Sequence, residues 1–252
     1  MSWLKIQNLK KRYILEDMEV DALNGIDLEI KEGGFLVIVG RSGSGKTTLL
    51  RILAGLECET AGEITFKGRI CGPESPLPVG MVFQEPRLMP WLSVENNILF
   101  PFLPGGRSKE MHQKALDILK MLGLEGYENA MPHQLSGGMA QRVALGRALS
   151  CDPEIVLMDE PLGALDYFTR RALQRELVRI DLQGGKTILM VTHDVGEALR
   201  MGTRVLVLKN GMIEASIPIP LEYPRDRHCE TFQTLLVEVL TALDDAEGQG
   251  GV

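Results

Sequence analysis

The sequence is poor in cysteine, in long apolar runs and in excess positive charge. Its four cysteines stand far apart, at Cys58, Cys71, Cys151 and Cys229. This spacing fits no zinc pattern, so we expect reduced thiols and no disulfide framework. With 27 Lys and Arg against 34 Asp and Glu, the net charge of −7 argues against nucleic acid as the main partner, because nucleic-acid phosphates bind clustered basic residues. No apolar run approaches the roughly 20 residues that span a bilayer. Any membrane role is therefore expected to be peripheral and to act through partners.

The remaining composition is that of an ordinary globular protein. Hydrophobic residues make up 44% and charged residues 24%, which excludes a disordered or collagen-like chain. The first residues show no secretory pattern, and we expect no targeting segment there. A chain of 252 residues is long enough for one large α/β domain or a core with a smaller lobe. No internal repeat is visible.

Hydrophobic periodicity predicts alternating strands and helices. Residues 4–30 read as short strands around a turn, and residues 72–108 as a loop-rich connection with one short helix after Ser93. Strands are expected at Ile26–Ile30, Phe35–Val39, Glu154–Asp159 and Thr187–Thr192, and a hairpin around Lys209-Asn210-Gly211. Helices are expected at Lys46–Leu56, Lys109–Leu122 with Gly123 as its cap, about Gly138 to Ser150, Tyr167–Gln183 and Glu230–Leu243, followed by a Gly/Asp/Glu tail. This order predicts a parallel sheet interrupted by a mostly helical lobe, roughly residues 86–150.

A glycine-rich loop follows the apolar strand at 35–39. Residues 40–47 read G-R-S-G-S-G-K-T and match the phosphate-loop pattern in full. Glycines allow backbone N–H groups to surround phosphate oxygens, and the helix that follows points its positive end at the same anion. Lys46 is expected to reach the β- and γ-phosphates of ATP, and Thr47 to bind Mg²⁺. The alternative is a flexible turn with a solvated lysine. The candidate nucleotide-binding residues are Gly40, Ser42, Gly43, Ser44, Gly45, Lys46, Thr47 and Thr48.

Two acids end a later apolar strand. Asp159 and Glu160 follow Ile155-Val156-Leu157-Met158. Parallel strands deliver their carboxyl ends to the ligand edge of a sheet. Successive strand residues point to opposite faces, so two adjacent acids take different roles. Asp159 is expected to complete the Mg²⁺ shell, and Glu160 to orient or deprotonate the attacking water. Taken alone, such a pair is also compatible with a solvated strand end.

A further motif resembles a known family. The run Leu135-Ser136-Gly137-Gly138-Met139, followed by Gln141-Arg142, closely resembles the signature of the ATP-binding cassette (ABC) family. The resemblance covers about residues 4–218. It implies an adenine-stacking Tyr13, a Q-loop glutamine at Gln84 that also binds the metal, a D-loop Asp166 and a switch histidine at His193.

The signature has its own chemistry. Ser136 is a good N-cap for the helix near Gly138, and two glycines leave the first N–H groups uncovered, which makes a second anion-binding helix start. Family resemblance implies that the signature of one subunit closes on the ATP held by another, in a head-to-tail homodimer. Many relatives carry Gln where this chain has Met139, but the anion site depends on Ser136 and backbone N–H groups.

Two residues whose roles are implied by the resemblance also have ordinary structural explanations. His193 is the switch residue by resemblance, yet a lone histidine at a strand end is usually structural. Tyr13 is alternatively an ordinary edge-strand tyrosine. Asp194 and Glu197 form an N-cap and N3 pair, so Asp194 is expected to cap a helix.

The fold implied is α/β: a P-loop NTPase core with a parallel sheet, an N-terminal antiparallel β subdomain and an inserted helical subdomain. The expected boundaries are 1–85 and 151–218 for the core, 86–150 for the helical signature subdomain, and 219–252 for a C-terminal helical tail.

Three kinds of cassette compete: an importer ATPase, an exporter ATPase and a soluble non-transport cassette. Residues 81–98, 135–149 and 224–227 resemble bacterial nitrate, sulfonate and taurine importer ATPases. The resemblance implies two integral membrane permease subunits, an extracytoplasmic solute-binding protein acting indirectly, and a peripheral location on the cytoplasmic face of the cell membrane. Pro90, Trp91 and Leu92 are either an exposed contact for a coupling helix of the permease or, for Trp91, part of the helical lobe's packing. The residues do not identify the solute.

Overall fold

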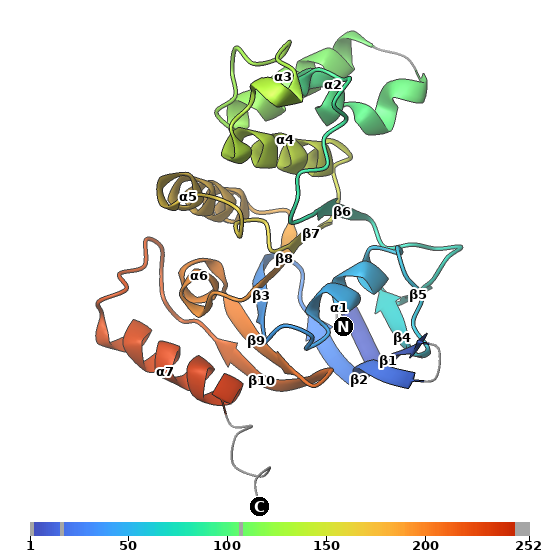
Figure 1. Ribbon diagram of the computed structural model, residues 1–252, viewed down its shortest axis with the longest axis vertical. Coiled ribbons are helices and arrows are strands. Elements are labelled where there is room, and N and C mark those ends of the chain that lie inside the picture. The colour runs from blue at the N-terminus through green and yellow to red at the C-terminus, as the bar shows by residue number, and fades with distance from the viewer. Residues whose placement is uncertain (1–2, 16–17, 106–107, 245–252) are drawn as a thin grey trace, which may run out of the picture. The chain divides into compact units, whose positions relative to one another are not determined.

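The computed structural model describes residues 3–15, 18–105 and 108–244 (Figure 1). The expected tail after residue 244 lies outside these residues. The chain divides into two compact units, residues 1–77 with 187–252 and residues 78–186. The subdomain boundaries given above stay a prediction.

An antiparallel sheet forms the N-terminal part of the first unit. Its strands, in the order β2-β1-β4-β5, are β2 (Met18–Ile30), β1 (Leu4–Leu15), β4 (Ala61–Phe66) and β5 (Arg69–Cys71). The expected antiparallel β subdomain is therefore present, with longer strands than the short ones predicted. A register shift between Ile6 and Leu9 interrupts β1. Because a bulge breaks the two-residue alternation, one long strand reads from sequence as separate short ones.

The first unit also holds a mostly parallel sheet, which confirms the α/β prediction. Its strands, in the order β10-β9-β3-β8, are β10 (Met212–Pro218), β9 (Arg204–Lys209), β3 (Gly34–Val39) and β8 (Thr187–Thr192). β3 runs parallel to both β8 and β9, and β10 pairs antiparallel with β9. The predicted hairpin turn is confirmed: Asn210 and Gly211 have φ of 48° and 73°, as a tight hairpin of this type requires.

Three helices cover this unit: α1 (Lys46–Leu53), α6 (Val195–Met201) and α7 (Glu230–Asp244). α6 packs against β3 and β8, and α7 against β9, β10 and α6 (Figure 1). α1 ends three residues before the expected Leu56, because Gly55 adopts a left-handed conformation with φ of 67°. Asp194 caps α6 as predicted, its carboxylate accepting from the N–H of Glu197 at 2.9 Å.

The second unit is mostly helical around one parallel strand pair. The strands are β6 (Val79–Val82) and β7 (Ile155–Asp159). The helices are α2 (Val94–Ile98), the 3₁₀ helix η1 (Phe100–Gly105), α3 (Lys109–Met121), the 3₁₀ helix η2 (Pro132–Gln134), α4 (Gly137–Ser150) and α5 (Tyr167–Gln183). α4 packs against α2, α3, α5 and β6 (Figure 1). No helix in the described ranges is both long and apolar enough to cross a bilayer.

Strand β6 lies in the segment that the sequence analysis read as loop. Its central Gly80 weakens the strand pattern, but the glycine is required, because a Cβ there would lie 2.5 Å from the carbonyl oxygen of Ala148 in α4. The cap of α3 is as predicted: Gly123 has φ of 63° and its N–H reaches the carbonyl of Lys120 at 3.1 Å.

Candidate active site

The phosphate loop connects β3 to α1 in the first unit. Val39, the last residue of β3, is paired with Thr192, the last residue of β8. Gly40 and His193 therefore leave the sheet side by side at its carboxyl edge, which is where ligands bind in open α/β sheets. The structure thus brings the exposed His193 to the same edge as the phosphate loop, as the sequence predicts.

Glycine is needed in this loop for two separate reasons. Gly43 and Gly45 have φ of 79° and 99°, a region that L side chains rarely adopt. Gly40 and Gly45 lie against backbone, because a Cβ on them would stand 2.4 Å from Leu208 O and 2.3 Å from Ala22 O. The loop is therefore seated between β2 and β9 with no space for side chains.

The interior of the loop carries polar groups suited to a polyphosphate. Lys46 is 6% exposed, and its Nζ donates to the carbonyl oxygens of Gly40 and Arg41 at 2.9 and 3.0 Å. The Ser44 hydroxyl is buried and has no hydrogen-bond partner among the described residues. Gly45 is the N-cap of α1 and has no side chain with which to cap the helix. A buried hydroxyl without a partner, next to a helix start, fits an anion bound in the loop.

Tyr13 lies beside this loop. Its hydroxyl is 3.4 Å from Thr48 Oγ1, and Lys11 Nζ lies 5.0 Å from the centre of its ring. Burial, followed by a hydrogen bond to Glu57, raises the pKa of Tyr13. Burial alone would raise the pKa of Glu57, but hydrogen bonds from Tyr13 and Lys11 outweigh it and lower that pKa. Lys11 also forms an ion pair with Glu57 at 3.3 Å. A half-exposed ring held in this way suits a stacking platform for a base.

In the second unit, Asp159 ends β7 and Glu160 follows it. Val82 of β6 is paired with Met158 of β7, so Gln84 and Glu160 leave neighbouring strands at the same level. A Cβ built on Gly163 would stand 3.8 Å from Gln84 Nε2 and 3.9 Å from Glu160 Oε2, which places both side chains beside the same glycine. Carboxylate, amide and hydroxyl oxygens are the donors that Mg²⁺ takes, so Asp159, Gln84 and Thr47 are chemically suited to it.

Glu160 has an unusual backbone for a glutamate. Its φ is 44°, in the left-handed region, and its carbonyl accepts from the N–H of Gly163 at 3.2 Å. Such a conformation costs on the order of 1 kcal/mol and is concentrated at functional sites. The backbone turns here immediately after the strand, which aims the side chain differently from a regular strand residue.

The signature residues begin α4. Exposed Ser136 is the N-cap, and its hydroxyl accepts from the N–H of Met139 at 3.3 Å. Nothing in the described residues lies within 4 Å of a Cβ built on Gly137, whereas a Cβ on Gly138 would stand 1.9 Å from Cγ2 of Thr169 in α5. The helix start is therefore open at Gly137, and the absence of a side chain at Gly138 lets α4 and α5 approach each other.

Asp166 is the N-cap of α5. Its Oδ1 accepts from the N–H groups of Phe168 and Thr169 at 3.0 and 3.2 Å. Hydrogen bonding to Thr169 is the main cause that lowers the pKa of Asp166. The carboxylate is exposed and is already used by its own helix, a local role that the sequence analysis did not assign to it.

Two side chains of α4, the buried Gln141 and the half-buried Arg147, hold the segment around Gln84, a role that sequence reasoning did not assign to them. Gln141 Nε2 donates to the carbonyl of Phe83 at 3.0 Å. Arg147 donates to the carbonyls of Arg87 and Pro86, both at 2.9 Å, and burial lowers its pKa. The only sequence feature that pointed to Gln141 was its place in the signature motif. No short-range pattern links α4 to a segment 58 to 61 residues earlier in the chain.

Asn97 organises the loop that carries Trp91. It is fully buried, and its side chain accepts from Met89 N at 2.7 Å and donates to the carbonyls of Met89, Leu92 and Ser93. Trp91 itself is 70% exposed, which decides against its packing inside the helical lobe.

The end of α7 reaches the phosphate loop. Asp244 Oδ1 lies 3.2 Å from Arg41 Nη2, and both side chains are exposed. Surface pairs of this kind contribute at most about 1 kcal/mol. The contact nevertheless places the last described residue beside the loop, a location that the sequence did not indicate.

Comparisons with known proteins show what the whole chain is similar to. A family model described as ABC transporter matches residues 23–163. The chain is similar to an uncharacterized ABC transporter ATP-binding protein of Methanocaldococcus jannaschii, with 46% identity over 96% of this chain and 91% of the relative. It is similar to the aliphatic sulfonates import ATP-binding protein SsuB of Bacillus subtilis, with 41% identity over 96% of both. Among solved structures, the dimeric ATP-binding cassette MJ0796 in a post-hydrolysis state with ADP and Pi has a TM-score of 0.76, 35% identity, and coverage of 87% of this chain and 100% of that one.

Proposed function

The chain belongs to the ABC transporter family and is the ATPase subunit of an importer, and from this premise we propose that it drives the uptake of an aliphatic sulfonate or a chemically similar small anion. The SsuB relative of Bacillus subtilis is 41% identical over 96% of this chain and is an aliphatic sulfonate importer by name. Nitrate and taurine belong to the same class of small polar solutes.

The observation that supports ATP as the nucleotide is the phosphate loop. The loop holds chemistry that suits phosphate oxygens: the buried Lys46, the unpartnered Ser44 hydroxyl and a glycine N-cap at the start of α1. We assign Tyr13 to the adenine, and Thr47, Gln84 and Asp159 to Mg²⁺. When bound, the metal neutralises charge that develops on the transferred phosphoryl group.

We assign water activation to Glu160 and His193. Glu160 holds or deprotonates the attacking water, and His193 at the carboxyl edge of β8 donates a hydrogen bond to the γ-phosphate. Lys46 offsets charge on the β- and γ-phosphates. These roles rest on the family motifs together with the strand-end positions described above.

We propose that two copies close head to tail around two ATP molecules. Ser136 and the open helix start at Gly137 offer a hydroxyl and N–H groups to the γ-phosphate held by the other copy. Asp166, the D-loop residue by family resemblance, lies at the start of α5, and we assign it to the same nucleotide site. A two-fold pair suits a chain that carries one copy of each half-site.

The remaining partners follow from the importer type. We propose two integral membrane permeases, contacted through the exposed Trp91, and a solute-binding protein outside the cell membrane that acts through them. The ATPase then lies peripherally on the cytoplasmic face of that membrane. An exporter or a soluble cassette is the alternative outcome of the transport test below.

A Ser44→Ala variant tests the phosphate site. Removing a buried hydroxyl that has no partner is expected to leave the nucleotide-free protein as stable as before or slightly more stable, while the affinity for ATP falls by about tenfold. Titration with ATP and thermal unfolding without ATP measure the two effects. Lower stability of the nucleotide-free variant with unchanged ATP affinity contradicts the assignment.

A Glu160→Gln variant tests the dimer. It is expected to bind ATP but not to hydrolyse it, so the closed pair accumulates. Size-exclusion chromatography with ATP and Mg²⁺ should show a dimer for this variant, and a monomer for the exposed control Glu125→Gln once its ATP is consumed. A monomer for Glu160→Gln, with ATP bound, refutes closure before cleavage.

The solute is tested by transport. The complex with its permeases is reconstituted into liposomes with ATP on the side of the ATPase, and uptake of labelled ethanesulfonate, nitrate and taurine is compared. Sulfonate uptake that requires ATP supports the proposal. Outward movement only, or no association with permeases, contradicts the importer assignment.

A further inference from the structure

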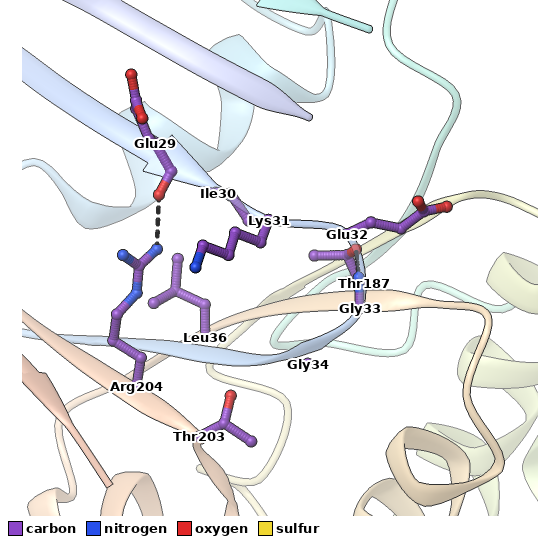
Figure 2. A pocket seen from close by; sticks show the side chains of 10 residues that line it. All are labelled: Glu29, Ile30, Lys31, Glu32, Gly33, Gly34, Leu36, Thr187, Thr203 and Arg204. Carbon is purple, nitrogen blue, oxygen red and sulfur yellow. Dashed lines mark hydrogen bonds between the residues drawn. The ribbon is translucent and has the colours of Figure 1, made fainter. Parts of the chain in front are cut away.

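A cavity of the first unit lies at the end of the parallel sheet away from the phosphate loop. It has a volume of about 830 Å³, within the range of ligand sites. It is lined where β3, β8 and β9 begin, at Gly34, Thr187 and Arg204 (Figure 2). The phosphate loop follows the opposite end of β3, and a strand of six residues spans about 20 Å. The cavity is therefore separate from the nucleotide site.

Two cations face this cavity without a carboxylate partner. Arg204 is half-buried, and its one hydrogen bond to the described residues donates from Nη2 to the backbone carbonyl of Glu29 at 2.8 Å. Burial lowers its pKa, which shows that the charge is partly desolvated. Lys31 forms no hydrogen bond or ion pair with any described residue. In Figure 2 its ammonium points toward the side where the guanidinium of Arg204 lies, beside Leu36.

Two acidic residues, Glu29 and Glu32, also line the cavity. The carboxylate of Glu29 is paired with Lys5, whose Nζ lies 3.7 Å away and which is not part of the lining. Figure 2 shows the carboxylates of Glu29 and Glu32 pointing away from Lys31 and Arg204. The lining therefore holds two cations and two carboxylates, and the cationic groups lie apart from the carboxylates (Figure 2).

The lining between the cations is apolar and roomy. Ile30 and Leu36 are each 4% exposed and belong to the core beneath the cavity. Gly33 has no side chain, and nothing lies within 4 Å of a Cβ built on it. The Thr203 hydroxyl accepts from the N–H of Phe35 and donates to its carbonyl, whereas the Thr187 hydroxyl accepts from the N–H of Gly33 and can still donate. A ligand can therefore contact two cations, one hydroxyl and an apolar surface.

We propose that this cavity is a second binding site, for a small organic anion. Its charged group lies between Lys31 and Arg204, where charge-assisted hydrogen bonds are available, and its short aliphatic body covers Leu36 and Ile30. Neither ATP nor the proposed solute is needed for this inference, which rests on the lining residues alone.

Butanesulfonate is a suitable probe, because it stays anionic at all working pH values. Calorimetric titration is done on the full chain in the presence of saturating Mg²⁺ and a non-hydrolysable ATP analogue, so that the phosphate loop is already filled. Binding should persist under these conditions. Loss of binding when the analogue is added assigns the anion to the phosphate loop and overturns the proposal.

Lys31→Met is the decisive variant, because Lys31 is exposed and its loss does not disturb the core. Binding should weaken about tenfold or more, as expected for removal of a charge-assisted hydrogen bond. Arg204→Gln, which keeps a donor for the Glu29 carbonyl, should weaken it similarly. The exposed Lys10→Met is the matched control and should bind like the parent. Equal affinity for all four proteins refutes the site.

Two further ligands test the chemical class. Butylammonium carries the same chain with the opposite charge and should not bind. Inorganic sulfate lacks the aliphatic body and should bind at least about tenfold more weakly than butanesulfonate, because it buries no methylene groups. Sulfate binding as tight as butanesulfonate binding overturns the organic class, and butylammonium binding overturns the role of the two cations.

Discussion

The two adjacent glycines of the signature are expected to respond in opposite ways to the same substitution. A Cβ at Gly138 would stand 1.9 Å from Cγ2 of Thr169, while a Cβ at Gly137 meets nothing within 4 Å. Both glycines belong to the first turn of α4. Comparing the same substitution at Gly137 and Gly138 therefore distinguishes the packing role of a glycine from its effect on helix propensity.

The magnitude follows from the distances. Carbon atoms normally approach to about 3.5–4.0 Å, so Gly138→Ala requires a separation of about 1.6–2.1 Å between α4 and the Thr169 side chain. Overpacking of this kind costs about 1–3 kcal/mol, and up to about 1 kcal/mol is regained because alanine favours the helix. The start of α5 resists movement, since the N–H of Thr169 is bonded to Asp166 at 3.2 Å. We expect Gly138→Ala to destabilise the protein by about 1–2 kcal/mol.

Gly137→Ala is the matched control. With open space and helical backbone, it should stabilise the protein by about 0.5–1 kcal/mol. Thermal unfolding should place the melting temperatures of the two variants on opposite sides of the parent, since about 1 kcal/mol corresponds to roughly 2–4 °C at this chain length.

A second substitution identifies the clashing atom. Thr169→Ser removes Cγ2 and leaves the Thr169 Cβ position at 3.4 Å from the built Cβ, a tight but tolerable contact. Gly138→Ala combined with Thr169→Ser should therefore be more stable than the sum of the single changes by about 1 kcal/mol. Equal stability of the two alanine variants, or strict additivity in the double variant, would refute the packing argument.

Three further outcomes follow from the contacts described. Tyr13→Ala should raise the KM for ATP about 5- to 100-fold if the ring stacks on adenine, while Tyr13→Phe should change it less than about threefold, as measured by steady-state ATPase assays. Asn97→Ala should lower the free energy of unfolding by about 1–3 kcal/mol because it leaves the Met89 N–H and the Leu92 carbonyl without their hydrogen-bond partner, whereas Trp91→Ala should change it by less than about 0.5 kcal/mol in urea titrations. The lowered pKa of Asp166 means that its stabilising charge is fully present above its ordinary value of 3.8 and is lost as the pH falls below it. Thermal unfolding between pH 7 and 2.5 should therefore show a smaller acid loss for Asp166→Asn, and parallel curves would contradict the capping role.

Local patterns predicted the parts of this protein that local physics determines. The buried run at β3, the phosphate loop and the start of α1 follow one another within residues 34–53, and each depends on neighbours in sequence. α5 and β8 begin and end at the predicted residues, because Asp166 caps one and apolar residues fill the other. Strand-end acids were recognisable for the same reason.

Contacts between distant segments were not predictable in this way. Asn97 holds a loop through four hydrogen bonds, yet an isolated asparagine in a helix has no distinctive local pattern. Arg147 lies 60 and 61 residues from the carbonyls that it binds. The bulge in β1 depends on Gly62 of β4, where a Cβ would stand 2.5 Å from Asn8 O. The need for glycine at position 62 is visible only once β1 and β4 are paired in the sheet.

Gly138 shows why a motif can be read correctly and still be incompletely understood. From sequence, its missing side chain exposes helix N–H groups to a phosphate, and this reasoning applies equally to Gly137. The structure separates the two, because only Gly138 meets Thr169. Thr169 in turn donates its N–H to Asp166, so the capped start of α5 places the Thr169 methyl group against the signature helix. A substitution at Gly138 that abolishes turnover therefore does not by itself demonstrate a phosphate contact. Nothing lies within 4 Å of a Cβ built on Gly137. Loss of activity on substitution of Gly137 would therefore demonstrate a phosphate contact.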